Sequence, residues 1–379
     1  MPSPDYQQTS LVNLVAALRA AAGGDTRGCA PLPLPATVTG ARHLILFIVD
    51  GLGEAMARAH GGLIARHLYQ RLTSVFPTTT VSAITSCYTG LTPSRHGMTG
   101  WFTWLRELGS VATVLPFVPR HGGPSYTEAG ITPADVMGCP SVFAGLRRPG
   151  HVVNPFYIAD SAYSRALSGP AQRHAYRDLD GLVTMLATLA RTPGLTYAYW
   201  PELDSAAHHS GVASTETLER LAAVERALEQ LLDRLAGMNA AVLVTADHGM
   251  VDTRPDHVID VAAHPPLTEC LALPLCGEPR AAYAYVHADR REAFEAYVGE
   301  HLGGQCRLLS RTQLLEAGWL GPGPVHPELA HRIGDYLLLM KDDYVITQRL
   351  AGERPFSQRG VHGGLSPEEL YVPLAVLVP

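Results

Sequence analysis

An unbroken apolar run at residues 44–49 is the feature that most constrains the fold of this chain. The run consists of strand-forming side chains and ends in Asp50, which Gly51 and Gly53 follow closely. Such a run is typical of a strand that is buried on both faces of a parallel sheet. Open sheets of this kind bind ligands at the carboxyl ends of their strands. Asp50 therefore indicates a functional carboxylate, although Asp is also a favoured helix cap.

Two further apolar segments end in metal-binding residue types. Residues 240–245 form a second run of the same design, which Asp247 and His248 follow, and a third strand-like segment leads into Asp204 and His208. The last two residues are four apart, so one helical turn places both side chains on the same face. Carboxylates and imidazoles bind divalent cations. The first two segment ends, at Asp50 and at Asp247-His248, predict a shared cation site, and Asp204 and His208 could together bind one ion. Each motif alone is also consistent with a helix cap.

A loop with three consecutive threonines lies between these segments. Thr78, Thr79 and Thr80 follow Pro77 and precede a run of small and β-branched residues. A loop that enters a helix presents hydroxyl groups beside free backbone N–H groups, and these N–H groups favour a bound anion. The same pattern is consistent with a threonine helix cap. The loop is therefore a candidate for an anion-binding site.

The remaining pattern predicts an α/β protein. Apolar runs and helical spacing predict strands at 44–49, 195–200, 240–245 and 370–378 and helices at 54–70, 178–191 and 214–236, after an amphipathic N-terminal helix. Residues 336–340 and 344–347 predict a β-hairpin. Residues 280–325 predict a small α+β insertion or cap within a single catalytic domain that spans residues 1–379.

Aromatic residues gather in the segment 101–170, among prolines and glycines. This composition is typical of long loops over a pocket, and loops of this length are usually functional or poorly ordered. Four aromatic side chains are candidates for the pocket, with a plain core role as the alternative: Trp101, Phe156, Tyr157 and Tyr163.

Composition excludes several classes of protein. The 379 residues carry a formal net charge of −6 and no basic run, so a nucleic-acid polymer is not an expected partner. No segment approaches the ~18–20 apolar residues of a membrane span, and the N-terminus lacks the basic start of a secretory signal. The six scattered cysteines indicate buried thiols in a reducing compartment, although a bridge between Cys270 and Cys276 stays open. We therefore expect a soluble cytoplasmic protein without a membrane partner.

Assembled in order, these motifs resemble the alkaline phosphatase superfamily, and specifically the type I phosphodiesterase/nucleotide pyrophosphatase family. The resemblance extends from the strand at 44–49 to the last strand. It rests on Asp50-Gly51, Phe76-Pro77-Thr78-Thr79-Thr80, Thr89-Gly90 to His96-Gly97, Asp204 to His208, Asp247-His248-Gly249 and His362-Gly363-Gly364. It implies an alkaline-phosphatase-like sandwich, in which a central, mostly parallel sheet carries helices on both faces.

The resemblance also implies two divalent metal ions, most often zinc, with manganese or magnesium as alternatives. Asp204, His208 and His362 would bind one ion. The other ion would be bound by Asp50, Asp247, His248 and Thr80. Four more histidines compete with His362, but none lies in a His-Gly-Gly turn: His257, His264, His326 and His331.

By the same resemblance, Thr80 is the nucleophile, with Thr79 as the alternative. In-line attack on phosphorus would give a phospho-threonine intermediate, which water would then hydrolyse. The chain departs from the better-known nucleotide pyrophosphatases at two points. It has Val81-Ser82-Ala83-Ile84 where they have Phe-Pro-Asn-His, and Met98-Thr99-Gly100-Trp101 where they place a phosphate-binding Asn. These departures affect nucleotide specificity and leave the implied metal ligands intact.

We therefore expect a metal-dependent hydrolase that acts on a small phosphorylated substrate, namely a phosphodiester or a nucleotide-like pyrophosphate. A phosphomonoesterase or a phosphonate hydrolase of the same superfamily is the alternative, because a change in the pocket lining can convert one specificity to the other. A catalytically silent metal- or phosphate-binding protein is a third reading. That reading requires a broken ligand set, which the sequence does not show. The expected assembly is a monomer or a homodimer.

Overall fold

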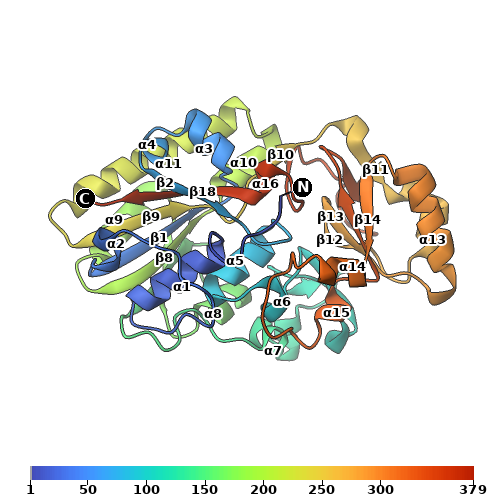
Figure 1. Cartoon of the computed structure of the whole chain (residues 1–379), viewed down its shortest axis with the longest axis horizontal. Helices are drawn as coiled ribbons and strands as arrows, with labels where there is room; N and C mark the ends of the chain where they lie inside the picture. The colour runs from blue at the N-terminus through green and yellow to red at the C-terminus, as the bar shows by residue number, and fades with distance from the viewer. Residues whose placement is uncertain (1) are drawn as a thin grey trace.

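The computed structural model describes residues 2–379 and contains a central seven-stranded sheet (Figure 1). In spatial order, its strands are β2 (Leu68–Thr73), β18 (Tyr371–Leu377), β9 (Ala240–Thr245), β1 (His43–Val49), β8 (Gly194–Trp200), β6 (Gly150–Pro155) and β7 (Gln172–Tyr176). β9, β1, β8, β6 and β7 are parallel to one another, whereas β18 runs antiparallel to β9 and β2. The predicted mostly parallel sheet is confirmed.

Helices cover both faces of this sheet, as an alkaline-phosphatase-like fold requires (Figure 1). One face carries α3 (Glu54–His60), α4 (Leu63–Arg66), α9 (Leu179–Leu189), α10 (Glu202–Ser210) and α11 (Thr215–Leu235). The other face carries α1 (Leu11–Ala21), α5 (Thr80–Thr89), α6 (Pro93–His96), α7 (Pro133–Met137) and α8 (Ala162–Ser168). The short helix α2 (Ala36–Thr39) precedes β1.

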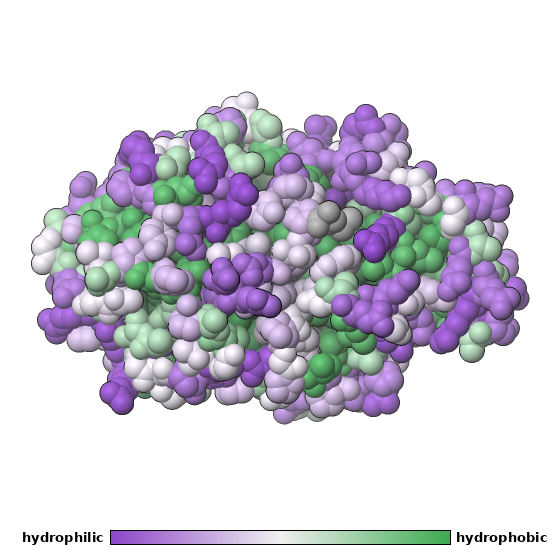
Figure 2. Space-filling model, in the orientation of Figure 1, coloured by the Kyte–Doolittle hydropathy of each residue, from purple (hydrophilic) through white to green (hydrophobic). Residues whose placement is uncertain are grey.

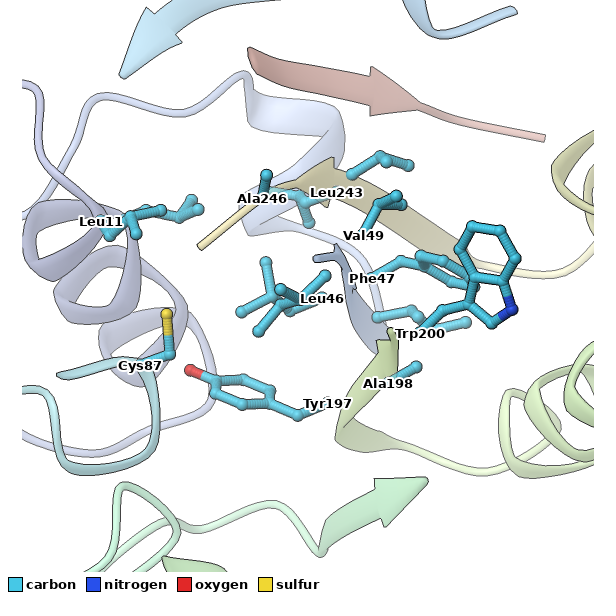
Figure 3. Packing of buried hydrophobic residues seen from close by; sticks show 14 of the residues in the cluster. Leu11, Leu46, Phe47, Val49, Cys87, Tyr197, Ala198, Trp200, Leu243 and Ala246 are labelled. Carbon is cyan, nitrogen blue, oxygen red and sulfur yellow. The ribbon is translucent and has the colours of Figure 1, made fainter. Parts of the chain in front are cut away.

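The strand β1 lies in the middle of the core, and all of its residues are buried. Its side chains alternate between the two faces of the sheet, so Leu46 points towards α1 and Cys87 of α5, while Phe47 and Val49 point to the opposite face near Trp200 (Figure 3). Burying a side chain of this size stabilises the fold by about 1.5–3 kcal/mol. The unbroken apolar run in the sequence therefore reflects helices on both faces of β1.

A second seven-stranded sheet lies beside the first and is antiparallel (Figure 1). In spatial order, its strands are β14 (Cys306–Ser310), β15 (Tyr336–Met340), β13 (Ala281–Ala284), β12 (Cys276–Glu278), β3 (Phe102–Leu105), β4 (Ser110–Thr113) and β5 (Val118–Pro119). The segment 280–325 contributes only β13 and β14 to this sheet, while residues 102–119 add three strands from much earlier in the chain. The division into a catalytic domain and a cap at 280–325 stays a prediction.

Shorter elements complete the fold around the second sheet. Two small sheets pair β10 (Val251–Asp252) with β17 (Gly360–Val361) and β11 (Val258–Asp260) with β16 (Val345–Thr347). The remaining helices are α12 (Pro265–Cys270), α13 (Arg291–Tyr297), α14 (Arg311–Glu316), α15 (Leu329–Arg332) and α16 (Pro367–Leu370).

Several local predictions were wrong. The predicted helix at 54–70 is divided into α3 and α4 at Gly61 and Gly62, and its last residues begin the edge strand β2, which pairs with β18. The predicted hairpin is absent from residues 2–379, because β15 pairs with β13 and β14 and β16 pairs with β11. All six cysteines are free, so Cys270 and Cys276 form no bridge.

Hydrophilic residues are spread over the face of the molecule shown in Figure 2, with apolar residues interspersed between them. None of the helices within residues 2–379 has the length and apolar character needed to cross a membrane.

Candidate active site

The carboxyl ends of three adjacent strands bring the predicted ligands together. β1 lies between β9 and β8, and Ile48 and Val49 of β1 are in register with Thr245 and Trp200. Asp50 follows β1, Asp247 and His248 follow β9, and α10 carries Asp204 and His208 just after β8. Because the three strands are parallel, their ends meet at one edge of the sheet.

Gly51 allows α10 to approach this edge. Its φ is +77°, a backbone conformation that residues with a Cβ rarely adopt. A Cβ at this position would lie 3.1 Å from the Cβ of Asp204 and 3.0 Å from the sulfur of Met250. Gly51 thus lets two ligand-bearing segments come into close contact.

Two groups of candidate ligands result, and they share His248. Asp50, Asp247 and His248 form the first group, and Asp204, His248 and His362 form the second; within each, the ligand atoms all lie within 4.8 Å of one another. The Nε2 atom of His248 lies 3.5 Å from a carboxylate oxygen of both Asp50 and Asp247. His208 joins the second group through its Nε2, which lies 3.3 Å from Asp204 Oδ2.

The three imidazoles are oriented by the backbone. In each ring, Nδ1 lies within hydrogen-bond distance of a carbonyl oxygen. These oxygens belong to Gly360 for His208 (2.7 Å), to Gly249 for His248 (3.1 Å) and to Thr78 for His362 (3.0 Å). A carbonyl oxygen only accepts, so each Nδ1 donates and each Nε2 presents its lone pair to the ligand groups, which is the usual orientation of metal-binding histidines. Burial, with the neighbouring imidazoles of His248 and His208, lowers the pKa of His362 well below its usual value.

The carboxylates present unpaired oxygens in the same place. Asp50 Oδ1, Asp204 Oδ1 and Asp247 Oδ2 are buried and have no hydrogen-bond partner within the described residues. Burial, and then the charges of Asp247 and Asp204, raise the pKa of Asp50 well above its usual value. Unpaired buried carboxylates are costly, and a bound cation removes that cost. The residues present therefore fit divalent metal ions.

The three threonines of the loop bind three different partners. Thr78 donates to the carbonyl oxygen of Gly364 (2.8 Å), and Thr79 donates to Glu278 Oε1 (2.6 Å). Thr79 precedes the first turn of α5, but its side chain does not cap the helix. Thr80 Oγ1 lies 3.2 Å from the Nε2 of His248. Of the three hydroxyl groups, only that of Thr80 lies beside the candidate ligand groups.

The four histidines that were alternatives to His362 as a metal ligand lie away from the candidate ligands. None of the four belongs to either ligand group within residues 2–379. For example, His257 stacks on the ring of Tyr344, and His264 bonds to the hydroxyl group of Tyr297.

Two cavities adjoin Thr80, and Trp101 lines both of them. The first, which we name the apolar cavity, has a volume of about 390 Å³ and is lined by Ile84, Tyr88, Leu115, Tyr157, Tyr163 and Leu167. The second, which we name the ligand cavity, has a volume of about 370 Å³ and is lined by Asp204, His208, His362, Glu278, Phe102 and Phe356. Of the predicted pocket aromatics, Phe156 is not among the residues that line either cavity.

Sequence reasoning missed two residues at this site. Tyr199, in β8, donates its hydroxyl proton to Asp50, and Glu278, at the end of β12, accepts from Thr79. Neither residue belongs to a local motif. Their contacts arise only when distant segments pack together, so the sequence carried no signal for them.

A buried ion pair supports the turn that carries His362. Arg280 donates to both oxygens of Glu369, at 2.8 and 3.1 Å, and both side chains are almost completely buried. The same carboxylate accepts from the backbone N–H of Gly364 (2.7 Å). Burial alone would raise the pKa of Glu369, but the Arg280 charge and these hydrogen bonds lower it. The pair therefore stabilises the fold above the unfolded-state pKa of Glu369, and this contribution is lost as the pH falls through the lowered value.

Replacing Glu369 by Gln is expected to lower the free energy of unfolding by about 3–5 kcal/mol, because it leaves Arg280 buried without a counter-charge. Denaturant unfolding at neutral pH measures the loss. The adjacent Glu368 is exposed, so Glu368→Gln is the matched control and should be nearly neutral. Equal stabilities for the two variants would contradict a structural role for the pair.

Comparison with known proteins agrees with this geometry. A family model described as type I phosphodiesterase/nucleotide pyrophosphatase matches residues 44–365. Murine ectonucleotide pyrophosphatase/phosphodiesterase 5 matches with a TM-score of 0.66 and 18% identity, over 88% of this chain and 87% of that chain. An inactive form of the same murine protein has been solved in complex with AMP.

Phosphonoacetate hydrolase from Sinorhizobium meliloti, solved with phosphonoformate, matches with a TM-score of 0.60 and 20% identity, over 89% of this chain and 90% of that chain. None of the curated proteins that were compared matches the chain. The structural matches show that the fold is alkaline-phosphatase-like.

Proposed function

Because the chain belongs to the type I phosphodiesterase/nucleotide pyrophosphatase family and is thereby a phosphoric ester hydrolase, we propose that it cleaves small phosphodiesters through a phospho-threonine intermediate on Thr80. The observation that carries the proposal is the position of the Thr80 hydroxyl group, which lies 3.2 Å from His248 Nε2 and beside both ligand groups.

The residues of the site divide into two sets of ligands. Asp50, Asp247, His248 and Thr80 would hold one divalent ion. Asp204, His208 and His362 would hold the other, with zinc as the first choice and manganese or magnesium as alternatives. Bound ions would favour the ionised Thr80 hydroxyl and stabilise the leaving oxygen.

The side chains of the chain itself orient the reaction. Tyr199 fixes one oxygen of Asp50, and the backbone carbonyls fix the three imidazoles. Thr80 Oγ1 then attacks phosphorus in line with the leaving group, and the bond from phosphorus to the leaving oxygen breaks. The phosphoryl group then stays on Thr80 together with the substituent that did not leave. Hydrolysis of this Thr80 phosphodiester by water releases the phosphate monoester of that substituent and restores the hydroxyl group.

A diester is the preferred substrate because no lysine or arginine of the described residues lines either the apolar cavity or the ligand cavity. A phosphodiester carries one negative charge at its phosphoryl group, whereas a monoester carries close to two at neutral pH. The second charge of a monoester would meet no cationic side chain in these cavities. The two cavities beside Thr80 also offer one place for each substituent of a diester.

The proposal predicts that the metal-reconstituted protein hydrolyses bis-p-nitrophenyl phosphate faster than p-nitrophenyl phosphate. Release of p-nitrophenol measures both rates. A chelator should abolish them, because it removes the ions that would favour the ionised Thr80 hydroxyl and stabilise the leaving oxygen. A chelator-sensitive preference for the monoester would keep the metal site and overturn the substrate class.

A phosphonate hydrolase is the second candidate, because phosphonoacetate hydrolase shares this fold. Release of inorganic phosphate from phosphonoacetate, with no turnover of either p-nitrophenyl ester, would favour it. Absence of turnover on all three substrates with two ions bound would indicate a silent binding protein.

A further inference from the structure

Glu278 is a buried carboxylate at the active site that the proposed mechanism does not use. It ends β12 of the second sheet, and it lines the ligand cavity together with Thr80, Asp204 and His362. Only 6% of its surface is exposed. The second sheet therefore contributes an acidic group to a site whose metal ligands come from the central sheet and its connections.

One oxygen of Glu278 is fully engaged, and the other is free. Oε1 accepts from the Thr79 hydroxyl group and from the Trp101 backbone N–H, both at 2.6 Å. No hydrogen bond within residues 2–379 involves Oε2, and this atom is not among the fully buried unpaired oxygens. Oε2 is therefore accessible from the space that Glu278 lines, namely the ligand cavity and a cavity that adjoins it.

The position of Glu278 is fixed by close backbone packing. Gly363, beside His362, has a φ of +123°, and a Cβ on it would lie 2.6 Å from the Cβ of Glu278. Gly100 approaches Gly277 equally closely, because a Cβ on Gly100 would lie 2.6 Å from the Cα of Gly277. The carboxylate is thus held at a set distance from the nucleophile loop and from the His362 turn.

The charged side chains around the Glu278 carboxylate determine which substrate groups can bind beside it. Among the described residues, no lysine or arginine lines the ligand cavity. Arg120 lies in the adjoining cavity that Glu278 also borders, and it is paired with Glu353 at 2.8 Å. Arg349 and Arg354 line that adjoining cavity too. Because these cationic side chains lie beyond Glu278, its repulsion acts on groups directly beside its carboxylate.

A negative group in the ligand cavity, next to the scissile bond, would lie close to the Glu278 carboxylate, which lines this cavity. Two unit charges a few ångströms apart near a protein surface repel by several kcal/mol. An uncharged or cationic alcohol meets no such repulsion. The aromatic rings of Trp101, Phe102 and Phe356 along the same cavity favour an uncharged or cationic group as well.

We propose that Glu278 is a specificity-determining residue, whose carboxylate selects phosphodiesters with an uncharged or cationic alcohol as the leaving group and rejects pyrophosphates. This inference rests on the proposed function, and it adds that the leaving group occupies the ligand cavity while the other substituent occupies the apolar cavity. It narrows the substrate class to phosphodiesters proper.

The experiment compares Glu278→Gln with the wild type on two substrates that share one nucleotide. The p-nitrophenyl ester of thymidine 5′-monophosphate has an uncharged leaving substituent, and thymidine triphosphate has an anionic one. Glutamine keeps an acceptor for Thr79 and Trp101 and removes the charge. Burial raises the pKa of Glu278 to about 7, so assays at about pH 9 keep the wild-type carboxylate ionised.

The wild type should prefer the p-nitrophenyl ester, and Glu278→Gln should raise kcat/KM for the triphosphate on the order of tenfold or more while changing that of the ester little. Asp260→Asn is the matched control for loss of one charge, because Asp260 is exposed and lines the adjoining cavity away from Thr80. Glu278→Ala should slow both substrates, because it also removes the acceptor of Thr79 and Trp101. An unchanged ratio in Glu278→Gln would overturn the proposal.

Binding provides a readout that does not depend on turnover. Calorimetry with zinc-loaded Thr80→Ala and Thr80→Ala/Glu278→Gln proteins should show tighter binding of thymidine triphosphate to the double variant, with little change for thymidine monophosphate. If the wild type hydrolyses neither substrate, the proposed function fails, and this comparison still tests Glu278. Equal affinities of the two proteins for the triphosphate would contradict the assigned role.

Discussion

Replacing Thr80 by Ala is expected to lower kcat for the preferred phosphodiester on the order of 10³-fold or more. The Thr80 hydroxyl group is the one hydroxyl of the loop that lies beside the ligand groups, 3.2 Å from His248 Nε2. Alanine is well tolerated in a first helical turn, so α5 should form normally. Initial rates at saturating substrate, on protein with verified metal content, measure the loss.

Two matched variants separate the nucleophile from its neighbours. Thr80→Ser keeps a hydroxyl group and should retain part of the activity. Thr79→Ala removes only the hydrogen bond to Glu278, so it should slow turnover less than Thr80→Ala. Mass spectrometry of acid-quenched protein should find the trapped phosphoryl group, with the substituent that did not leave, on Thr80. Phosphate on Thr79, or a full rate in Thr80→Ala, would contradict the assignment.

The sequence predicted those parts of the site that depend on local pattern. Asp50 and Asp247 each follow an apolar run that is long enough to cross a covered sheet, so their position at a strand end could be inferred from neighbours in the chain. The i, i+4 spacing of Asp204 and His208 likewise gave their common face, which α10 shows. The prediction of His362 as a ligand depended on its His-Gly-Gly turn and on the family resemblance.

The parts that could not be predicted depend on distant partners. The edge strand β2 follows a helix-like pattern, and its pairing with β18 joins segments about 300 residues apart. β15 and β16 have the alternation of a hairpin, but each finds a different strand to pair with. Glu278 is a single acid before a proline, and only the approach of Thr79 and Trp101 gives it a role.

Asp50→Asn is expected to change stability in opposite directions with and without metal. In the chelated protein, burial and the Asp247 and Asp204 charges raise the pKa of Asp50, so its charged form destabilises the fold. Any stability that Asp50 contributes in its protonated form is lost as the pH rises through this raised value. Asparagine carries no charge and still offers an oxygen to Tyr199, which donates to Asp50 in the structure.

At neutral pH and with chelator, Asp50→Asn should therefore unfold at a higher temperature than the wild type. With zinc, the order should reverse, because the wild type gains the binding free energy of an ion that Asp50 helps to hold. Asp256→Asn is the control, since Asp256 is exposed and lies outside both ligand groups. If zinc stabilises Asp50→Asn as much as the wild type, Asp50 is not a ligand. If Asp50→Asn is no more stable than the wild type in chelator, the unpaired carboxylates of this site do not repel one another. The two outcomes separate metal binding from electrostatic strain, because only the first requires an ion.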